Sequence, residues 1–234
     1  MLLQVSARDR PYCCVVLTDC DLILPCRDEA PALPALLAKV PAAFRVIVVD
    51  NGSRDRTADV AHELGATVVR ESQPGYGAAV HAGVRAATAD LVAVMDADGS
   101  MDPADLLPLL DDVSQGRASM AVGRRRPTSA GAQPWHAKVG NAAVLGWLRR
   151  RTGLTVHDIA PMRVCRRQAL LDLDLQDRRF GYPVELLVKA QAAGWVFTEH
   201  DITYRPRADG TRSKVSGTVR GTLRTARDFA KVLS

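Results

Sequence analysis

Short apolar runs alternate with segments of helical spacing along the first half of this 234-residue chain, and this alternation constrains the fold most. Five apolar runs predict strands: Asp21–Pro25, Arg45–Asp50, Ala66–Arg70, Leu91–Asp96 and Ala118–Gly123. The segments between them predict helices: Ala32–Val40, Arg54–Leu64, Gly77–Ala87 and Pro103–Val113. Strands that alternate with helices predict an α/β fold, a mostly parallel sheet with helices on both faces.

The second half of the chain is less regular. We expect, in order, a loop, a helix, a polar turn, a second helix and an extended stretch: Pro127–Pro134, Trp135–Arg150, Val156–Arg163, Pro183–Ala193 and Trp195–Arg207. The first 18 residues fit no element, so we expect a flexible extension over residues 1–18. One domain is then expected over residues 19–214, because 47% hydrophobic content and this length suffice for a sizeable core.

Polar residues stand where the first four predicted strands end, which is the edge of a parallel sheet where ligands bind. Carboxylates follow three of these strands, within Pro25–Glu29, Asp50–Ser53 and Asp96–Asp98. A glycine-rich stretch within Glu71–Gly77 follows the other one. The sequence therefore predicts a binding site at this edge.

The pair Asp96 and Asp98 is the most informative of these signals. In an extended chain the two side chains point the same way, with Ala97 between them. Two carboxylates on one side suit Mg²⁺ or Mn²⁺, which fill their other positions with water and substrate phosphates. The alternative is structural, because Asp98-Gly99 is also a turn signal and Asp102-Pro103 a helix start.

Two neighbouring loops also have a functional and a structural interpretation. Asp50 to Ser53 lies where it would reach a ribose or a base, yet Asn-Gly and Ser are also ordinary choices for a turn into a helix. The stretch Gln73–Val84 places glycines at a helix start, where backbone N–H groups suit an anion. A dinucleotide site is disfavoured, because Val80 replaces the final glycine of that motif.

Composition excludes several other classes of protein. The longest apolar runs fall far short of the roughly 20 residues of a membrane span. The N-terminus lacks the pattern of an export signal, so we expect a cytoplasmic protein. The five cysteines have no paired Cys-x-x-Cys spacing, which favours reduced thiols over disulfides or structural zinc.

Positive charge is concentrated at the C-terminal end. Thr203–Ser234 holds eight Lys or Arg and two Asp, a net of +6, whereas the whole chain carries +5 and the rest therefore −1. A helix over residues 215–234 would set an apolar stripe beside a basic one, which suits peripheral contact with the inner face of the cell membrane. The alternative is a surface helix packed on the domain. Nucleic acid is disfavoured, because no aromatic residues alternate with these basic ones.

Taken together, the segments "LPCRDEAPALPALL", "VIVVDNGSRDRTADVA", "QPGYGAAVHAG" and "LVAVMDADGSMDP" resemble the nucleotide-sugar half of family 2 glycosyltransferases with the GT-A fold. The later stretch "YPVELLVKAQAAGWVFTEHDITYRPRADGTRSK" is similar to the branch that transfers mannose or glucose to dolichyl or polyprenyl phosphate. The resemblance covers nearly all of the chain after residue 18. It implies a Rossmann-like GT-A domain and a metal-dependent transferase.

The resemblance also implies roles for single residues. The nucleotide-sugar site would comprise Pro25, Arg27, Glu29, Asp50, Gly75, Asp96, Ala97 and Asp98, and the metal would lie at Asp96 and Asp98. The diphosphate or the acceptor phosphate would be bound by Arg163, Arg207, Ser213 and Lys214. The catalytic groups would be Asp98, Asp158, Arg207 and Lys214. Three positions depart from the family pattern: Asn51 replaces a second Asp, Arg56 a common Gly, and Ser100 a frequent Gln on the metal side.

The resemblance further implies transfer of a hexose from a GDP- or UDP-sugar to a polyprenyl phosphate, with inversion at the anomeric carbon, and these residue types suit such a reaction. A departing diphosphate needs positive charge, and unit charges ~4 Å apart interact by about 4 kcal/mol at an effective dielectric of ~20. A polyprenyl phosphate acceptor is already ionised, whereas a hydroxyl acceptor would need Asp158 as base. The alternative function is a soluble transferase for a small-molecule hydroxyl acceptor. A binding module without turnover is disfavoured by the intact Asp96 and Asp98.

Overall fold

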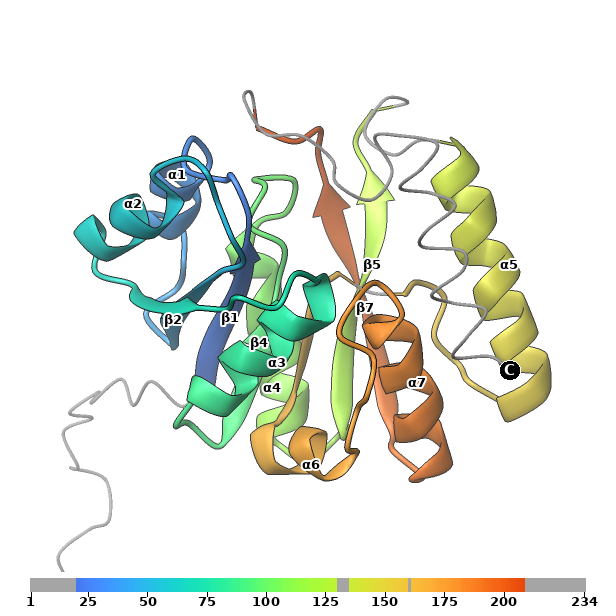
Figure 1. The fold of residues 1–234 in the computed structure, drawn as a ribbon. Coiled ribbons are helices and arrows are strands. Elements are labelled where there is room, and N and C mark those ends of the chain that lie inside the picture. The colour runs from blue at the N-terminus through green and yellow to red at the C-terminus, as the bar shows by residue number, and fades with distance from the viewer. Residues whose placement is uncertain (1–19, 130–134, 160, 209–234) are drawn as a thin grey trace, which may run out of the picture.

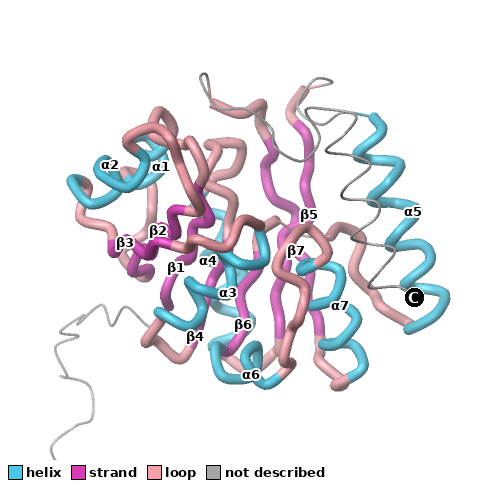
Figure 2. The backbone as a smooth tube through the Cα atoms, in the orientation of Figure 1, coloured by secondary structure: helices cyan, strands magenta, loops and turns pink. Residues whose placement is uncertain are grey.

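A seven-stranded sheet in the order β3-β2-β1-β4-β6-β5-β7 organises the part of the chain described by the computed structural model, which is residues 20–129, 135–159 and 161–208 (Figures 1 and 2). The strands are β1 Cys20–Cys26, β2 Phe44–Asp50, β3 Thr67–Arg70, β4 Leu91–Val94, β5 Met120–Pro127, β6 Arg163–Arg166 and β7 Phe197–Tyr204. Neighbouring pairs among β1 to β4 are parallel, and so are β5 and β7. Strand β6 runs antiparallel to β4 and β5.

The helices connect these strands and cover both faces of the sheet (Figure 1). They are α1 Leu33–Leu37, α2 Thr57–Glu63, α3 Tyr76–Ala86, α4 Leu106–Ser114, α5 Trp135–Thr152, α6 Arg167–Asp172 and α7 Tyr182–Ala192, with a 3₁₀ turn at Pro103–Asp105 before α4. No helix in the described ranges is both long and apolar enough to cross a membrane.

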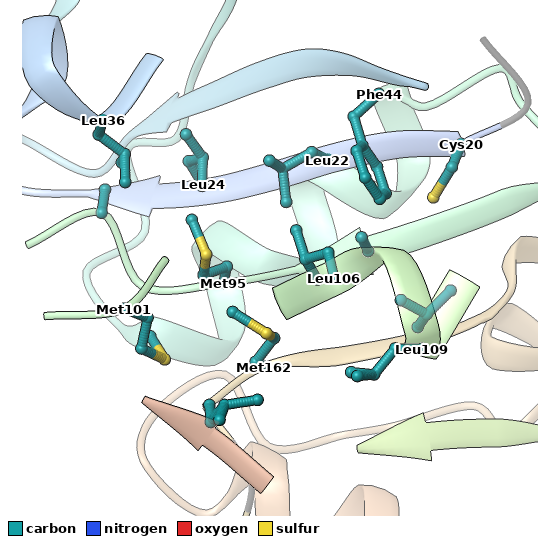
Figure 3. Packing of buried hydrophobic residues seen from close by; sticks show 14 of the residues in the cluster. Cys20, Leu22, Leu24, Leu36, Phe44, Met95, Met101, Leu106, Leu109 and Met162 are labelled. Atoms are coloured by element: carbon teal, nitrogen blue, oxygen red, sulfur yellow. The ribbon is translucent and has the colours of Figure 1, made fainter. Parts of the chain in front are cut away.

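Two apolar clusters, one on each face of the sheet, hold the layers together. Successive side chains of a strand point to opposite faces, so Leu22 and Leu24 of β1 pack in one cluster and Ile23 packs in the other. The first cluster joins the sheet to α1, α2 and α4, and Figure 3 shows Leu106 and Leu109 of α4 within it. The second cluster includes residues of α3, α5, α6 and α7. The predicted α/β fold with two covered faces is confirmed.

Strand β6 is the main element that the sequence patterns did not predict. We expected only a polar turn up to Arg163, but residues 163–166 pair with Leu91–Val94 and Met120–Val122. Four residues are too few to show a period, and two of the four are arginines. Because β6 is antiparallel, its first residue lies at the edge where its neighbours end. Arg163 therefore reaches the predicted site, directly opposite Val94.

The predicted helices and strands of the first half are all present, with ends shifted by a few residues. The predicted extended stretch contains β7, and β5 runs on to Pro127 beyond its predicted end at Gly123. Three expectations lie outside the described residues and stay predictions: the extension over residues 1–18, the helix over residues 215–234, and the roles of Ser213 and Lys214.

Candidate active site

The carboxyl ends of β1, β2 and β4 come together as predicted, and the loops that follow them surround one cavity. The register pairs Cys26 with Asp50, so the loops after β1 and β2 lie side by side. The lining residues are Pro25, Cys26, Arg27, Glu29, Asn51, Gly75, Tyr76, Ala79, Asp96, Ala97, Asp98, Phe180 and Arg207. Of the residues predicted for the nucleotide-sugar site, all but Asp50 line this cavity.

The cavity measures about 140 Å³, less than the roughly 300–1,000 Å³ of typical small-molecule sites. A larger hollow of about 950 Å³ lies along α5 beside Trp147 and Leu154, but none of the described residues that line it carries a carboxylate. Volume is therefore a poor guide in this protein. The smaller cavity gathers the charged groups and is the candidate site.

Arg207 is bound to Asp98 across the cavity. Two backbone hydrogen bonds join the segment after β7 to the loop after β4: Arg205 N donates to Ser100 O at 2.7 Å, and Ala208 N donates to Asp98 O at 2.9 Å. These bonds bring the Arg207 guanidinium to 2.6 Å from Asp98 Oδ2. Asp98 is 2% exposed, and its Oδ1 accepts the Ser100 N–H. Two predicted residues, one from the middle and one from the end of the domain, thus form a direct ion pair.

Asp96 lies beside this pair with a perturbed charge. Burial and the neighbouring Asp98 carboxylate raise the pKa of Asp96 to about 6, while Arg207, Arg125 and Arg163 act in the opposite direction. Two carboxylates in one partly desolvated site repel each other, and a cation between them relieves that repulsion.

The residues present suit a hard divalent cation. Among the described residues no group of three or more His, Cys, Asp or Glu could hold a metal ion, so no closed cage of side chains is seen there. Mg²⁺ uses one or two carboxylates together with water and substrate phosphates, which matches an acidic pair facing a cavity. Ser100, at the position of the frequent Gln, is fully buried, and its hydroxyl is not part of the cavity wall.

The glycine-rich loop has a different role from the predicted one. Gly77 N and Ala78 N, in the first turn of α3, donate to Arg179 O and Arg178 O at 3.0 and 2.8 Å. Gly75 N donates to Asn51 Oδ1 at 2.8 Å. These three amides are therefore not free for a phosphate, which contradicts the anion-binding interpretation of their N–H groups. The predicted contact of Gly75 with the nucleotide-sugar stays a prediction, and Gly75 does line the cavity. A Cβ at Gly75 would lie 2.0 Å from Arg178 O, so glycine here permits close packing of two backbones.

Asn51 organises the same wall. Besides accepting from Gly75 N, its amide group donates to Glu71 O and Gln73 O at 3.0 and 2.7 Å. The departure from a second Asp is thereby explained, since an aspartate has no N–H to donate.

Asp50 does not line the cavity, and its carboxylate accepts the Ser53 N–H at 3.0 Å. A nucleoside contact by Asp50 stays a prediction.

Asp158, the predicted base, is bound by a cation that the sequence reasoning missed. The Arg125 guanidinium donates to both of its oxygens at 2.6 and 2.8 Å, and Arg125 N donates to Oδ2 at 3.0 Å. Burial alone would lower the pKa of Arg125, but the bond to Asp158 outweighs it and raises that pKa. Action of Asp158 as a base stays a prediction that requires this pair to open. The signal that could have identified Arg125 is its place near the end of β5, a strand that runs in the same direction as β4.

Arg163 is 3% exposed and lies behind the cavity wall, where its Nη2 donates to the Tyr76 hydroxyl at 2.8 Å. Its predicted contact with a phosphate is untested. The sequence reasoning also missed Tyr76 and Phe180, although Tyr76 stood inside the quoted "QPGYG" motif. Nothing in the local pattern singled out Phe180, which reaches the cavity from the loop before α7.

Comparison with known proteins agrees with this architecture. The profile of the family described as "Glycosyl transferase family 2" matches residues 21–173. An uncharacterized glycosyltransferase of Mycobacterium tuberculosis is 55% identical over 213 residues, 91% of this chain and 97% of the relative. A polyprenol monophosphomannose synthase of Mycolicibacterium smegmatis is 33% identical over 216 residues, 84% and 80% of the two chains. A dolichyl-phosphate hexose transferase of Haloferax volcanii is 31% identical over 199 residues, 83% and 86% of the two chains.

Among solved structures, glucosyl-3-phosphoglycerate synthase of Mycobacterium tuberculosis, in complex with Mn²⁺, UDP and glucosyl-3-phosphoglycerate, has the same fold. Its TM-score is 0.71 at 18% identity, over 96% of this chain and 84% of that one. At that identity the likeness shows the fold alone. The family match and the 55% identical relative show more: this chain belongs to glycosyl transferase family 2 and is a glycosyltransferase.

Proposed function

We propose that this glycosyltransferase moves a hexose, mannose or glucose, from a GDP- or UDP-sugar to a polyprenyl phosphate, with Mg²⁺ or Mn²⁺ as cofactor. The observation that carries the proposal is the group formed by Asp96, Asp98 and Arg207 in one cavity at the ends of parallel strands. Sequence similarity to transferases named for polyprenol and dolichyl phosphate supports the acceptor class.

The donor would lie along the strand order of the sheet. The nucleoside would occupy the side of β1 and β2, near Pro25, Arg27 and Glu29, and the diphosphate would lie beside the carboxylates that follow β4. Because the cavity is small, donor binding requires it to widen. Movement of the Arg207 side chain would widen the cavity. Arg207 would then leave its ion pair with Asp98 and pair with the diphosphate of the donor instead.

In the reaction an oxygen of the acceptor phosphate forms a bond to the anomeric carbon, and the bond from that carbon to the diphosphate breaks. The electron pair leaves with the nucleoside diphosphate. A divalent ion at Asp96 and Asp98 would supply Lewis-acid stabilisation of this leaving group. Arg207 would add a second positive charge. An ionised phosphate attacks without a base, so the Arg125–Asp158 pair could stay closed.

Transfer assays with Mn²⁺ test this proposal, using GDP-mannose and UDP-glucose as donors. A short polyprenyl phosphate, and separately a small hydroxyl acceptor, would be the acceptors. We expect transfer from one donor to the lipid phosphate and little to the hydroxyl compound. Transfer to the hydroxyl acceptor alone would overturn the proposed acceptor class. If transfer continues unchanged after a chelator removes the metal ion, the proposed need for a metal cofactor is wrong.

A further inference from the structure

Tyr76 lines the candidate site and has a hydroxyl proton that no hydrogen bond among the described residues uses. It is the first residue of α3 and lines the cavity, and its hydroxyl oxygen accepts a hydrogen bond from Arg163 Nη2 at 2.8 Å. A guanidinium can only donate. The Tyr76 oxygen is therefore the acceptor of this bond, and its own O–H proton remains to be donated.

The protonation state of Tyr76 supports this role. Burial raises the pKa of Tyr76 to about 12, against the opposing effect of Arg163. The phenol is therefore neutral at physiological pH. Within the described part of the chain no acceptor is recorded for its O–H. Arg163 is 3% exposed, and its Nε has no hydrogen-bond partner among those residues. Because Arg163 is buried behind the cavity wall, its hydrogen bond holds the Tyr76 phenol from that side.

The place of Tyr76 in the sheet suggests what the O–H meets. The order β2-β1-β4-β6 puts the nucleoside side at β2 and β1 and the carboxylates at β4. Arg163 begins β6, opposite Val94 and one strand beyond the carboxylates, and it draws the Tyr76 hydroxyl to that side. If the nucleotide-sugar lies along this edge with its nucleoside at β2 and β1 and its diphosphate at β4, its sugar comes next, on the side of β6.

We propose that Tyr76 is a specificity-determining residue, whose hydroxyl, positioned by Arg163, donates a hydrogen bond to a hydroxyl oxygen of the donor hexose. The inference rests on the proposed function, because it presupposes a nucleotide-sugar in this cavity. A neutral donor suits a neutral sugar hydroxyl. A site built to bond a hydroxyl also discriminates strongly against an analogue that lacks it, since its polar group is then left unpaired.

The test uses Tyr76→Phe with Tyr182→Phe as matched control. Tyr182 is also a tyrosine near Arg163, but it is 1% exposed and does not line the cavity. Binding with Mn²⁺ is measured by calorimetry for each protein, first with GDP and UDP, then with whichever of GDP-mannose and UDP-glucose the wild type uses. Monodeoxy analogues of that sugar complete the series.

We expect Tyr76→Phe to bind the nucleoside diphosphate within about twofold of wild type and the nucleotide-sugar about tenfold more weakly, the effect of one hydrogen bond. For wild type, one monodeoxy analogue should bind about tenfold more weakly than the parent nucleotide-sugar. For Tyr76→Phe, that analogue and the parent nucleotide-sugar should bind equally well. Tyr182→Phe should match wild type throughout. A merely structural role for Tyr76 would weaken every ligand equally.

Equal weakening of nucleotide and nucleotide-sugar, or no analogue that distinguishes the two proteins, would overturn the role of Tyr76 and leave the proposed function standing. A wild type that neither binds nor uses either nucleotide-sugar would overturn the proposed function, and the role of Tyr76 with it.

Discussion

Replacing Gly75 with alanine should loosen the wall of the candidate site that carries Phe180. Gly75 has φ +152° and ψ 147°, a combination that is almost confined to glycine and costs about 1–3 kcal/mol for other residues. The new Cβ would also lie 2.0 Å from Arg178 O, so the Arg178 loop has to move. That loop accepts two backbone hydrogen bonds from the start of α3, each contributing about 0.5–1.5 kcal/mol.

The two effects together predict a loss of about 2–6 kcal/mol in the free energy of unfolding. Substitutions at two other glycines distinguish the cost of backbone strain from the cost of the displaced loop. Gly65 also has a positive φ, +82°, but nothing lies within 4 Å of an added Cβ, so Gly65→Ala should cost only the strain of about 1–2 kcal/mol. Gly146 lies in α5 with open space around it, so Gly146→Ala should stabilise by about 0.5–1 kcal/mol.

Urea unfolding followed by circular dichroism gives the three changes in free energy, and hydrogen exchange at the Gly77 and Ala78 amides locates the effect. Exchange at these amides should rise in Gly75→Ala and stay unchanged in the two controls. If Gly75→Ala is destabilised no more than Gly65→Ala, the packing of this loop against the Arg178 backbone does not hold the site together.

Two further predictions concern charges. Asp21 is fully buried and accepts from Arg45 at 2.7 and 2.8 Å and from Thr88 N and Ala89 N; Asp21→Ala should lower the free energy of unfolding by about 2–3 kcal/mol. Thermal or urea unfolding measures this, and a loss below about 0.5 kcal/mol would contradict it. With the pKa of Asp96 near 6 because of burial and Asp98, its ionised fraction falls from about nine-tenths at pH 7 to about one-tenth at pH 5. Mn²⁺ affinity, measured by calorimetry without nucleotide, should fall about tenfold over that range, whereas a flat profile would contradict the perturbed pKa.

The architecture was predictable because its first half repeats one unit. Each strand there is apolar, is followed by a polar loop, and returns through a helix whose spacing is visible in the sequence. That regularity also placed Asp96 and Asp98 correctly at the edge of the sheet. Strand β6 broke the pattern, since it is short, starts and ends with arginine, and is defined only by its pairing with β4 and β5.

Contacts between distant segments were the other limit of the sequence. Arg207 was predicted from its resemblance to a family motif, but its ion pair with Asp98 depends on the backbone bonds of Arg205 and Ala208. Asp158 was singled out without Arg125, because this partner lies 33 residues earlier, on β5, whereas Asp158 lies in the turn before β6. The amides of the glycine loop looked free because nothing in their own segment accepts from them.

In the proposed reaction Asp98 and a divalent metal support hexosyl transfer, and the turnover of Asp98→Asn measures that requirement. Asparagine keeps the shape and the acceptor for Ser100 N but lacks the charge. The matched control is Asp102→Asn, which can still cap the turn before α4 through Ala104 N and lies outside the cavity wall. With Mn²⁺, the donor that the wild type uses and polyprenyl phosphate, we expect Asp98→Asn to lose at least about 100-fold in kcat/KM, and Asp102→Asn to stay near wild type. Equal turnover by Asp98→Asn and wild type would show that the Asp98 carboxylate is not needed for transfer.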